Sequence, residues 1–256
     1  MDEQERVRAQ FTAQVERFVT APHVNAAEPV ERLVALAAPR ADERVLDVGC
    51  GPGLLARAFG PRVAGFLGVD VTPAMLMKAR EIAAREGLSH ARFVVGHAGR
   101  LPVGTGRMDL VVTRLALHHM SDPDGAIREI ARATRPGGRL ACFDIAASED
   151  PGAAAHQERV ERLRDASHAR TLAPSELLGL LGRAGLEVER LEMLTHRIDV
   201  DDWIARAEQS PAEAAEARAL LVTAVGTRRF GGRTVAHDAG RLVFDQRWML
   251  VLARRC

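Results

Sequence analysis

The sequence predicts an α/β protein in which a mostly parallel sheet is covered by helices on both faces. Between Arg44 and Ile145, short apolar runs alternate with segments whose apolar residues recur at helical spacing. Repeated strand–helix units of this kind form parallel sheets with helices packed on each side. The length of 256 residues fits one such domain. A last apolar run, Leu242–Leu252, follows a loop without a helical crossover, so we expect it to be antiparallel.

The amino-terminal half begins with two helices. An apolar stripe at helical spacing covers Arg6–Phe18, and a second helix covers Pro29–Ala37. Pro73 and Gly87 stand at the preferred places of these residues at the two ends of a helix. The predicted strands are Arg44–Val48, Val63–Val69, Arg92–Gly96, Met108–Thr113 and Arg139–Ile145, and the helices between them are Leu54–Phe59, Pro73–Glu86 and Pro123–Thr134.

The carboxy-terminal part has a different pattern. Ala146–Ala155 is typical of a linker and Gly226–Gly240 of a loop. Helices are expected over Gln157–Asp165, Pro174–Ala184 and Val200–Gly226, the last with a break at Pro211. Leu186–Leu194 alternates apolar and charged residues, which predicts a half-exposed strand that pairs with Leu242–Leu252. We therefore divide a single domain, 1–256, into amino-terminal helices (1–40), a core (41–146), insertions (147–184 and 199–240) and carboxy-terminal strands (185–198 and 241–256).

The composition argues against several functional classes. Lys and Arg number 35 and Asp and Glu 34, so no basic surface for nucleic acid is indicated. The three cysteines have no paired spacing, which predicts neither a metal site nor a disulfide framework. No apolar run is long enough for a membrane span, and the charged amino terminus is unlike a secretory signal. We expect a cytoplasmic monomer or homodimer with no nucleic-acid or membrane partner.

The most informative segment is Val45–Gly53, which reads Val-Leu-Asp-Val-Gly-Cys-Gly-Pro-Gly. A short apolar strand containing Asp47 leads into Gly49, Gly51 and Gly53, and a helix follows. Such glycine loops let the backbone approach a ligand at a helix amino terminus. Asp70 ends the next strand at the spacing of an acidic residue that accepts hydrogen bonds from ribose hydroxyls. The GxGxG pattern and the Asp within the strand both differ from the NAD-binding fingerprint.

These features resemble the first two motifs of class I S-adenosylmethionine (SAM) methyltransferases. Phe93–Pro102 resembles the third motif, and Arg135–Leu140 resembles the turn before the fifth strand. Together the segments are similar to the UbiE-like small-molecule branch. The resemblance implies a Rossmann-like sheet of seven strands in the order 3-2-1-4-5-7-6, with strand 7 antiparallel. It also implies SAM as cofactor and S-adenosylhomocysteine as product.

The resemblance implies a set of cofactor-binding residues: Asp47, Gly49, Cys50, Gly51, Gly53, Asp70, Val71, Met75, His97, Ala98 and Arg114. One position departs from the family pattern, because His97 stands where the third motif usually has Asp. A neutral imidazole nitrogen could accept a hydrogen bond from the adenine amino group, whereas an imidazolium could not. Alternatively, the His97 side chain turns away and the backbone N–H of Ala98 contacts the adenine alone.

Three histidines are candidates for catalysis. His118 and His119 follow the fourth strand, at the sheet edge where α/β proteins hold their ligands. His168 lies in Leu163–His168, which resembles an R-D-P-S-H segment of bacterial relatives with Ala166 in place of Pro. Because adjacent residues point apart, we expect one of the pair to face the acceptor and favour His119. The alternative is that these histidines only pack or cap helices.

The sequence thus predicts an enzyme that transfers a methyl group from SAM to an O, N or C atom of a small organic molecule. A helical lid made of Arg6–Phe18 and Gln157–Asp165 is expected to exclude water from the site. Two alternatives stay open, namely a SAM-binding enzyme that transfers no methyl group and a SAM-binding regulatory protein. An NAD-dependent oxidoreductase is disfavoured, and the absence of Tyr excludes a Tyr–Lys dehydrogenase pair.

Overall fold

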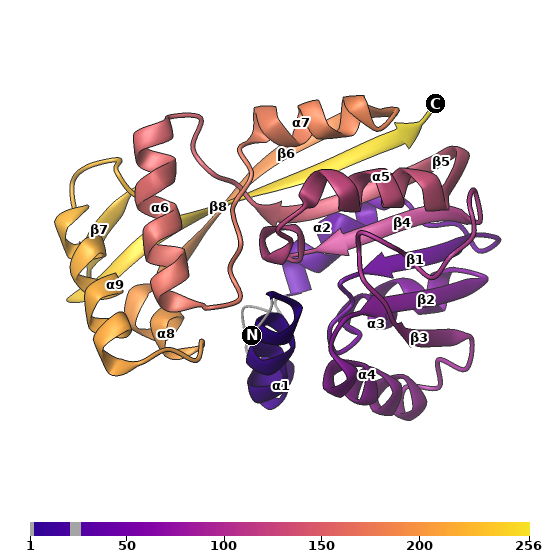
Figure 1. Ribbon diagram of the computed structural model, residues 1–256, viewed down its shortest axis with the longest axis horizontal. Helices are drawn as coiled ribbons and strands as arrows, with labels where there is room; N and C mark the ends of the chain where they lie inside the picture. The colour runs from indigo at the N-terminus through magenta and orange to yellow at the C-terminus, as the bar shows by residue number, and fades with distance from the viewer. Residues whose placement is uncertain (1–2, 21–26) are drawn as a thin grey trace.

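The computed structural model describes residues 3–20 and 27–256 as a three-layered structure around a central sheet (Figure 1). The strands are β1 (Arg44–Val48), β2 (Gly65–Asp70), β3 (Ala91–Val95), β4 (Met108–Arg114), β5 (Thr134–Ile145), β6 (Leu186–Asp199), β7 (Val235–Asp238) and β8 (Arg241–Arg255). Their spatial order is β3-β2-β1-β4-β5-β8-β6, with β7 paired to β8. Strands β1 to β5 are parallel, and β8 is antiparallel to its three neighbours. The predicted fold class, strand order and antiparallel last strand are confirmed.

Helices cover both faces of this sheet. They are α1 (Glu3–Thr20), α2 (Ala27–Ala37), α3 (Leu54–Phe59), α4 (Pro73–Arg85), α5 (Pro123–Ala133), α6 (Pro151–Arg164), α7 (Pro174–Arg183), α8 (Val200–Ala205) and α9 (Pro211–Thr223), with 3₁₀ turns η1 (Gly60–Arg62) and η2 (Leu117–His119). Leu33, Leu55 and Leu76 of α2, α3 and α4 share one apolar core. Residues of α5 and α7 share the core of the opposite face.

The structure differs from the sequence-based boundaries in three places. The expected linker is helical from Pro151, because Asp150 caps the amino terminus of α6 by accepting from the N–H of Ala153. The expected loop Gly226–Gly240 contains β7, which pairs with the extended β8. Helix α7, grouped above with the insertion, buries Leu177 and Leu181 against the main sheet.

The far ends of β6 and β8 extend beyond the main sheet into a second packing unit. We call this unit the small lobe; it comprises α6, α8, α9, β7 and those strand ends, on the left of Figure 1. It has its own apolar core, in which Val160, Trp203, Phe230 and Phe244 are buried. The lobe is therefore a packed structure held to the main sheet by two continuous strands.

Helix α1 lies between the small lobe and the main sheet (Figure 1). On the sheet side, Nε of Arg8 donates to the carbonyl of Val71 at 2.9 Å. On the lobe side, Nε2 of Gln10 donates to the carbonyl of Glu208 at 3.1 Å. These bonds make α1 a bridge across the carboxyl edge of the sheet.

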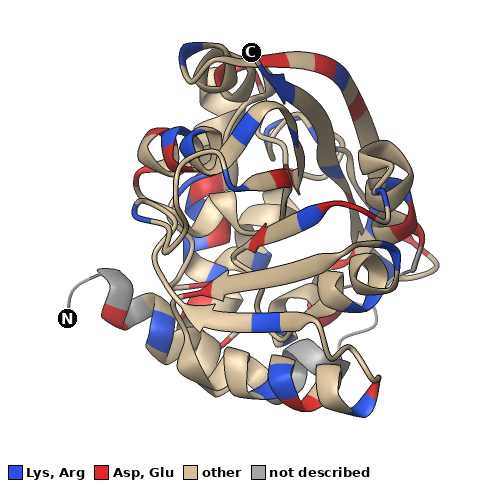
Figure 2. Cartoon of the chain, turned by 90° about the vertical axis from the view of Figure 1, so that its right-hand side faces the viewer, with Lys and Arg blue, Asp and Glu red and all other residues tan. Residues whose placement is uncertain are grey.

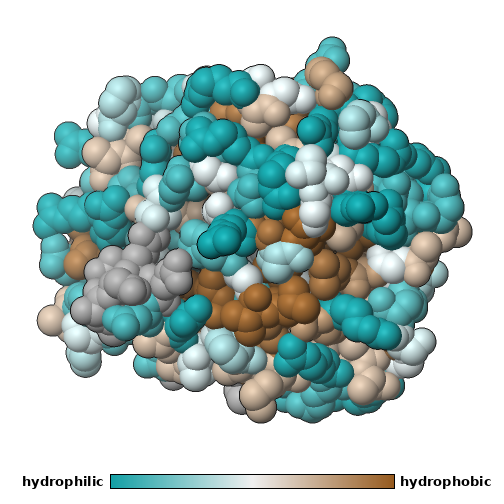
Figure 3. Space-filling view, turned by 45° about the vertical axis from the view of Figure 1, so that its right-hand side comes forward, coloured by the Kyte–Doolittle hydropathy of each residue, from teal (hydrophilic) through white to brown (hydrophobic). Residues whose placement is uncertain are grey.

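The charged residues are mixed in sign over the surface. Figure 2 shows Lys and Arg interspersed with Asp and Glu on most elements, in keeping with a net charge of +1. On the face in Figure 3, hydrophobic residues gather near the centre and hydrophilic ones border them. Among the described residues, no helix is long and apolar enough to span a bilayer.

Candidate active site

The glycine loop after β1 has a backbone conformation that favours glycine. Gly49, Gly51 and Gly53 all have positive φ, at 74°, 50° and 83°, a region that residues with a Cβ seldom adopt. A Cβ on Gly49 would lie 2.5 Å from the Cβ of Ala116, whereas one on Gly51 would meet open space. The loop therefore packs tightly on the segment after β4 and leaves room at Gly51.

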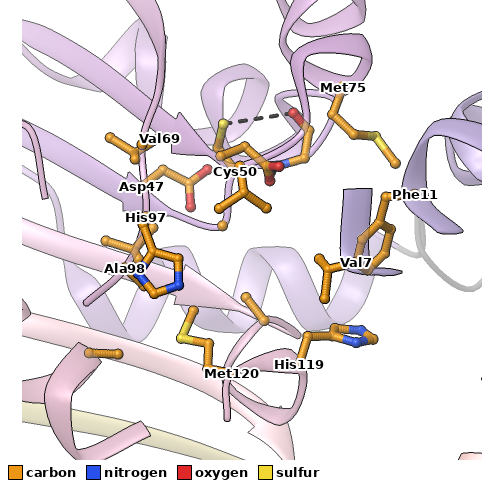
Figure 4. Close-up of a pocket in the computed structure, with 18 of the residues that line it drawn as sticks. Val7, Phe11, Asp47, Cys50, Val69, Met75, His97, Ala98, His119 and Met120 are labelled. Atoms are coloured by element: carbon orange, nitrogen blue, oxygen red, sulfur yellow. Dashed lines mark hydrogen bonds between the residues drawn. The ribbon is translucent and has the colours of Figure 1, made fainter. Parts of the chain in front are cut away.

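The loop borders a cavity at the carboxyl edge of the sheet (Figure 4). The cavity encloses about 1300 Å³ of empty space, part of it open to solvent. Of the predicted cofactor residues, ten line it and Gly53 does not; these ten are Asp47, Gly49, Cys50, Gly51, Asp70, Val71, Met75, His97, Ala98 and Arg114. Val7 and Phe11 of α1 and His119 and Met120 form the other end. Within the described residues, no group of three or more His, Cys, Asp and Glu could hold a metal ion.

Asp70 is held at the loop by two backbone bonds. Its Oδ2 accepts from the N–H of Gly51 at 2.9 Å, and its Oδ1 accepts from the N–H of Thr72 at 2.8 Å. Burial raises the pKa of Asp70 even though these bonds oppose the shift. Since a carboxylate oxygen has two acceptor sites, each oxygen retains capacity for a ligand hydroxyl.

Asp47 is buried and points into the same cavity without a partner. Neither of its oxygens accepts a hydrogen bond within the described protein. Burial and the nearby Asp70 carboxylate raise the pKa of Asp47 well above its ordinary value, although Arg114 lowers it. Burial in turn lowers the pKa of Arg114 to about 10. An unsatisfied buried carboxylate costs free energy, so this site suits a ligand with a cationic or hydrogen-bond-donating group.

His97 uses one ring nitrogen within the protein. Its Nδ1 accepts from the N–H of Gly99 at 3.1 Å, so in the neutral ring the proton is on Nε2. Only one nitrogen of a neutral imidazole is an acceptor, and here that nitrogen is occupied. The Nδ1 lone pair of His97 is thus used within the chain, and the neighbouring Ala98 is buried in the wall of the cavity.

His118 is paired with a buried carboxylate. Its Nδ1 lies 2.5 Å from Oδ1 of Asp144, and Oδ2 of Asp144 accepts from the N–H of Leu117 at 2.8 Å. Burial alone would lower the pKa of His118, but Asp144 outweighs it, so the pKa is raised. His118 does not line the cavity, and we interpret it as a structural residue that anchors η2 to β5.

His119 lines the cavity opposite the carboxylates. The ring of Phe11 meets it edge-on, with centroids 4.8 Å apart. Burial, with the adjacent charge of His118, lowers the pKa of His119 to about 3. The two neighbouring histidines therefore differ, because one shares a proton with a carboxylate and the other is neutral.

His168 lies near this pair but faces elsewhere. Its ring centroid is 5.8 Å from that of His118, and its Nε2 lies 3.2 Å from Oε2 of Glu158. It lines a neighbouring cavity between the end of α6 and α1, and not the cavity of His119. The structure thus brings the three histidines together but directs one of them to the candidate acceptor region.

Comparison with known proteins agrees with this geometry. A family model described as a methyltransferase domain matches residues 46–142. The uncharacterized methyltransferase YcgJ of Bacillus subtilis is 36% identical over 179 residues, which cover 70% of this chain and 71% of that protein. The chain belongs to the SAM-dependent methyltransferases. The predicted family and enzyme class are confirmed.

The solved structure of YcgJ and one further relative extend this likeness. The crystal structure of YcgJ matches with a TM-score of 0.83 at 30% identity, over 89% of this chain and 98% of that one. A ubiquinone biosynthesis O-methyltransferase of Thiobacillus denitrificans is 31% identical over 170 residues, which cover 64% of this chain and 73% of that protein.

Sequence reasoning missed several residues that shape the site of this methyltransferase. Leu115 has a φ of 50°, an uncommon conformation for a branched residue, and turns the chain from β4 into η2. Ser167 contacts the ring of His119. No local pattern marks either residue, although Ser167 precedes His168, which the sequence indicates as a candidate for catalysis.

Proposed function

We propose that this methyltransferase transfers the methyl group of SAM to a hydroxyl or amine of a small organic molecule, with His119 accepting the proton that the acceptor loses. The observation that supports this proposal is a single cavity whose two ends differ in chemistry. Two carboxylates and a glycine loop stand at one end, and a neutral imidazole among apolar side chains stands at the other. The relative from Thiobacillus denitrificans, which is named for O-methylation, supports a small organic acceptor.

The residues at the first end fit the cofactor. We propose that Asp47, which has no partner in the protein, accepts from the ammonium of the methionine half, and that Arg114 pairs with its carboxylate. The remaining acceptor sites of Asp70 suit the two ribose hydroxyls. Bound SAM supplies an electrophilic methyl group attached to a positively charged sulfur. The leaving group is S-adenosylhomocysteine, whose sulfur is neutral.

The residues at the second end fit an apolar acceptor with one polar group. Val7, Phe11 and Met120 line the cavity around His119. Such walls exclude water and hold the acceptor in line, and alignment of this kind contributes about 7–11 kcal/mol. A positioned base contributes a further ~10²–10⁴-fold where the acceptor carries a proton. We propose that residues 41–146 hold the cofactor and that α1 covers the acceptor, since Val7 and Phe11 line the cavity and no described residue of the small lobe does.

The test is a turnover screen with SAM and a panel of hydroxyl- and amine-bearing metabolites. Mass spectrometry should find S-adenosylhomocysteine and a methylated product in equal amounts. Conversion of a panel member with SAM unchanged would indicate a reaction without methyl transfer. Tight SAM binding without turnover on any member would indicate a regulatory protein.

A further inference from the structure

The turn after α6 is joined to the histidine pair by several hydrogen bonds. The carbonyl of His118 accepts from the N–H groups of Ala169 at 2.9 Å and Arg170 at 3.1 Å. Nδ1 of His119 lies 3.1 Å from both the carbonyl oxygen and Oγ of Ser167. The segment of His118 and the segment of Ser167, which carry the three histidines predicted from the sequence as candidates for catalysis, therefore form one structure.

These contacts locate the proton of the His119 ring. A carbonyl oxygen can only accept a hydrogen bond, so Nδ1 must carry the hydrogen that it shares with Ser167. Oγ of Ser167 donates its own proton to Oδ1 of Asp165 at 2.6 Å, so this oxygen also faces Nδ1 as an acceptor. Since burial and His118 keep the ring neutral, the lone pair of His119 is on Nε2.

Asp165 holds Ser167 in place. Its Oδ1 accepts from the backbone N–H of Ser167 at 2.9 Å as well as from the hydroxyl, and its carbonyl accepts from the N–H of His168 at 3.0 Å. The Asp165 residue is 7% exposed, so water competes little for these bonds. One hydroxyl group separates this carboxylate from the imidazole.

We propose that Asp165 and Ser167 are positioning residues that hold His119 as the Nδ1–H tautomer, which leaves Nε2 as the ring nitrogen that receives a proton from the acceptor. The tautomer itself does not depend on turnover, whereas its catalytic use rests on the proposed function. In that step the acceptor O–H or N–H bond breaks and its proton goes to Nε2. The electron pair of the acceptor forms the bond to the methyl carbon as the C–S bond breaks, and those electrons go to sulfur. The resulting imidazolium of His119 lies near Asp165 and gives its proton to water after the methylated product leaves.

Nitrogen-15 NMR of histidine-labelled protein at pH 7 tests the tautomer directly. The His119 signals are assigned by their loss in His119→Gln. We expect the long-range proton–nitrogen pattern of an Nδ1–H ring. An Nε2–H ring or an imidazolium at this position would overturn the proposal, whatever the turnover screen finds. An Nδ1–H ring in a protein that forms no S-adenosylhomocysteine would instead count against the proposed function alone.

Asp165→Ala tests the positioning role, with Asp150→Ala as matched control. Asp150 also accepts a backbone N–H, that of Ala153 at 2.7 Å, at the opposite end of α6. We expect Asp165→Ala to give a mixture of both tautomers at His119 and Asp150→Ala to give none. Asp165→Asn retains an accepting oxygen and should keep the Nδ1–H ring, which covers the case that Asp165→Ala does not fold. If His119 is entirely the Nδ1–H tautomer in folded Asp165→Ala, or if Asp150→Ala loses this tautomer, Asp165 does not position His119 and the proposal is wrong for this residue.

Discussion

The two ends of the cavity are built in different ways. At the cofactor end, Asp47 and Asp70 belong to adjacent strands, the loop between β1 and α3 supplies the glycines, and His97, Ala98 and Arg114 lie at the ends of β3 and β4. At the acceptor end, His119 lies where η2, α1 and the turn of Asp165 meet. The first end is made by short segments at the carboxyl ends of neighbouring strands, each of which forms a recognisable sequence motif, whereas the second end has no such motifs and depends on the complete fold. The comparison teaches that sequence motifs report the cofactor more directly than the acceptor.

The largest expected effect is on turnover, at the acceptor end. His119→Gln should lower the rate of S-adenosylhomocysteine release by ~10²–10³-fold, the lower part of the usual contribution of a positioned base, because its lowered pKa makes His119 a weaker base. SAM affinity by calorimetry should not change, because His119 lies at the acceptor end of the cavity and does not belong to the cofactor motifs. His196→Gln, whose ring stacks on Trp248 and does not line the cavity, is the control. If His119→Gln retains full turnover, His119 is not a base, and the rate enhancement comes from the alignment of the acceptor with the methyl group.

His118 should affect stability where His119 affects rate. His118→Ala leaves Asp144 buried without its partner, which should lower the free energy of unfolding by ~3–5 kcal/mol. The pKa of His118 is raised, so its contribution is complete below its ordinary value of 6.5 and is lost as pH rises through the raised value. The pKa of Asp144 is lowered, so its contribution is present above 3.8.

Urea unfolding across pH 5.5 to 9 measures this dependence. The wild-type chain should lose stability toward the alkaline end, and Asp144→Asn should lose less over the same range. Equal slopes for the two proteins would show that another group controls the pH dependence.

How much could be predicted follows the same division. The glycine alternation, Asp70, Phe93–Pro102 and Arg135–Leu140 predicted the family, because each is a short local motif, and the resemblance to that family implied the sheet order. The short strand β7 was missed, since its pairing depends on how far β8 extends beyond the main sheet. Ser167 was missed because 48 residues separate it from His119, and only the folded chain brings them together.

Asp70→Ala sharpens the comparison at the cofactor end. Two ribose hydroxyls would lose a charged acceptor, which should weaken SAM binding by ~1.5–3 kcal/mol, or about 10- to 150-fold. Calorimetry gives the affinity, and Asp109→Ala is the control, since Asp109 pairs with Arg44 and Arg135 and does not line the cavity. An unchanged affinity in Asp70→Ala would contradict the ribose assignment.

Asp47→Asn should separate stability from binding. The native state holds this carboxylate buried and unpartnered, and its raised pKa means that the charged form destabilises the fold at neutral pH. Removing the charge should therefore stabilise the protein without ligand by ~1 kcal/mol, in the range for an unsatisfied buried group. The increase in melting temperature on adding S-adenosylhomocysteine should become smaller. If Asp47→Asn is less stable than the wild type and its melting temperature rises with S-adenosylhomocysteine as much as that of the wild type, Asp47 contributes to folding and not to ligand binding.

The smallest expected effect is on the cover over the acceptor end. Helix α1 reaches the main sheet through Arg8 and the small lobe through Gln10, and its Phe11 lies against His119. By contrast, α6 buries Val160 in the core of the small lobe, so its backbone is held whether or not the cavity is filled. We therefore expect S-adenosylhomocysteine to slow amide exchange several-fold in α1 and less in α6. A helix held by few buried contacts opens often without ligand, so ligand binding reduces its opening the most. Exchange measured by mass spectrometry with and without the ligand tests this, with α5 as the internal reference. If α1 exchanges equally with and without the ligand, α1 is a fixed part of the fold and not a cover. If the change is larger in α6, the cover over the acceptor end is the small lobe.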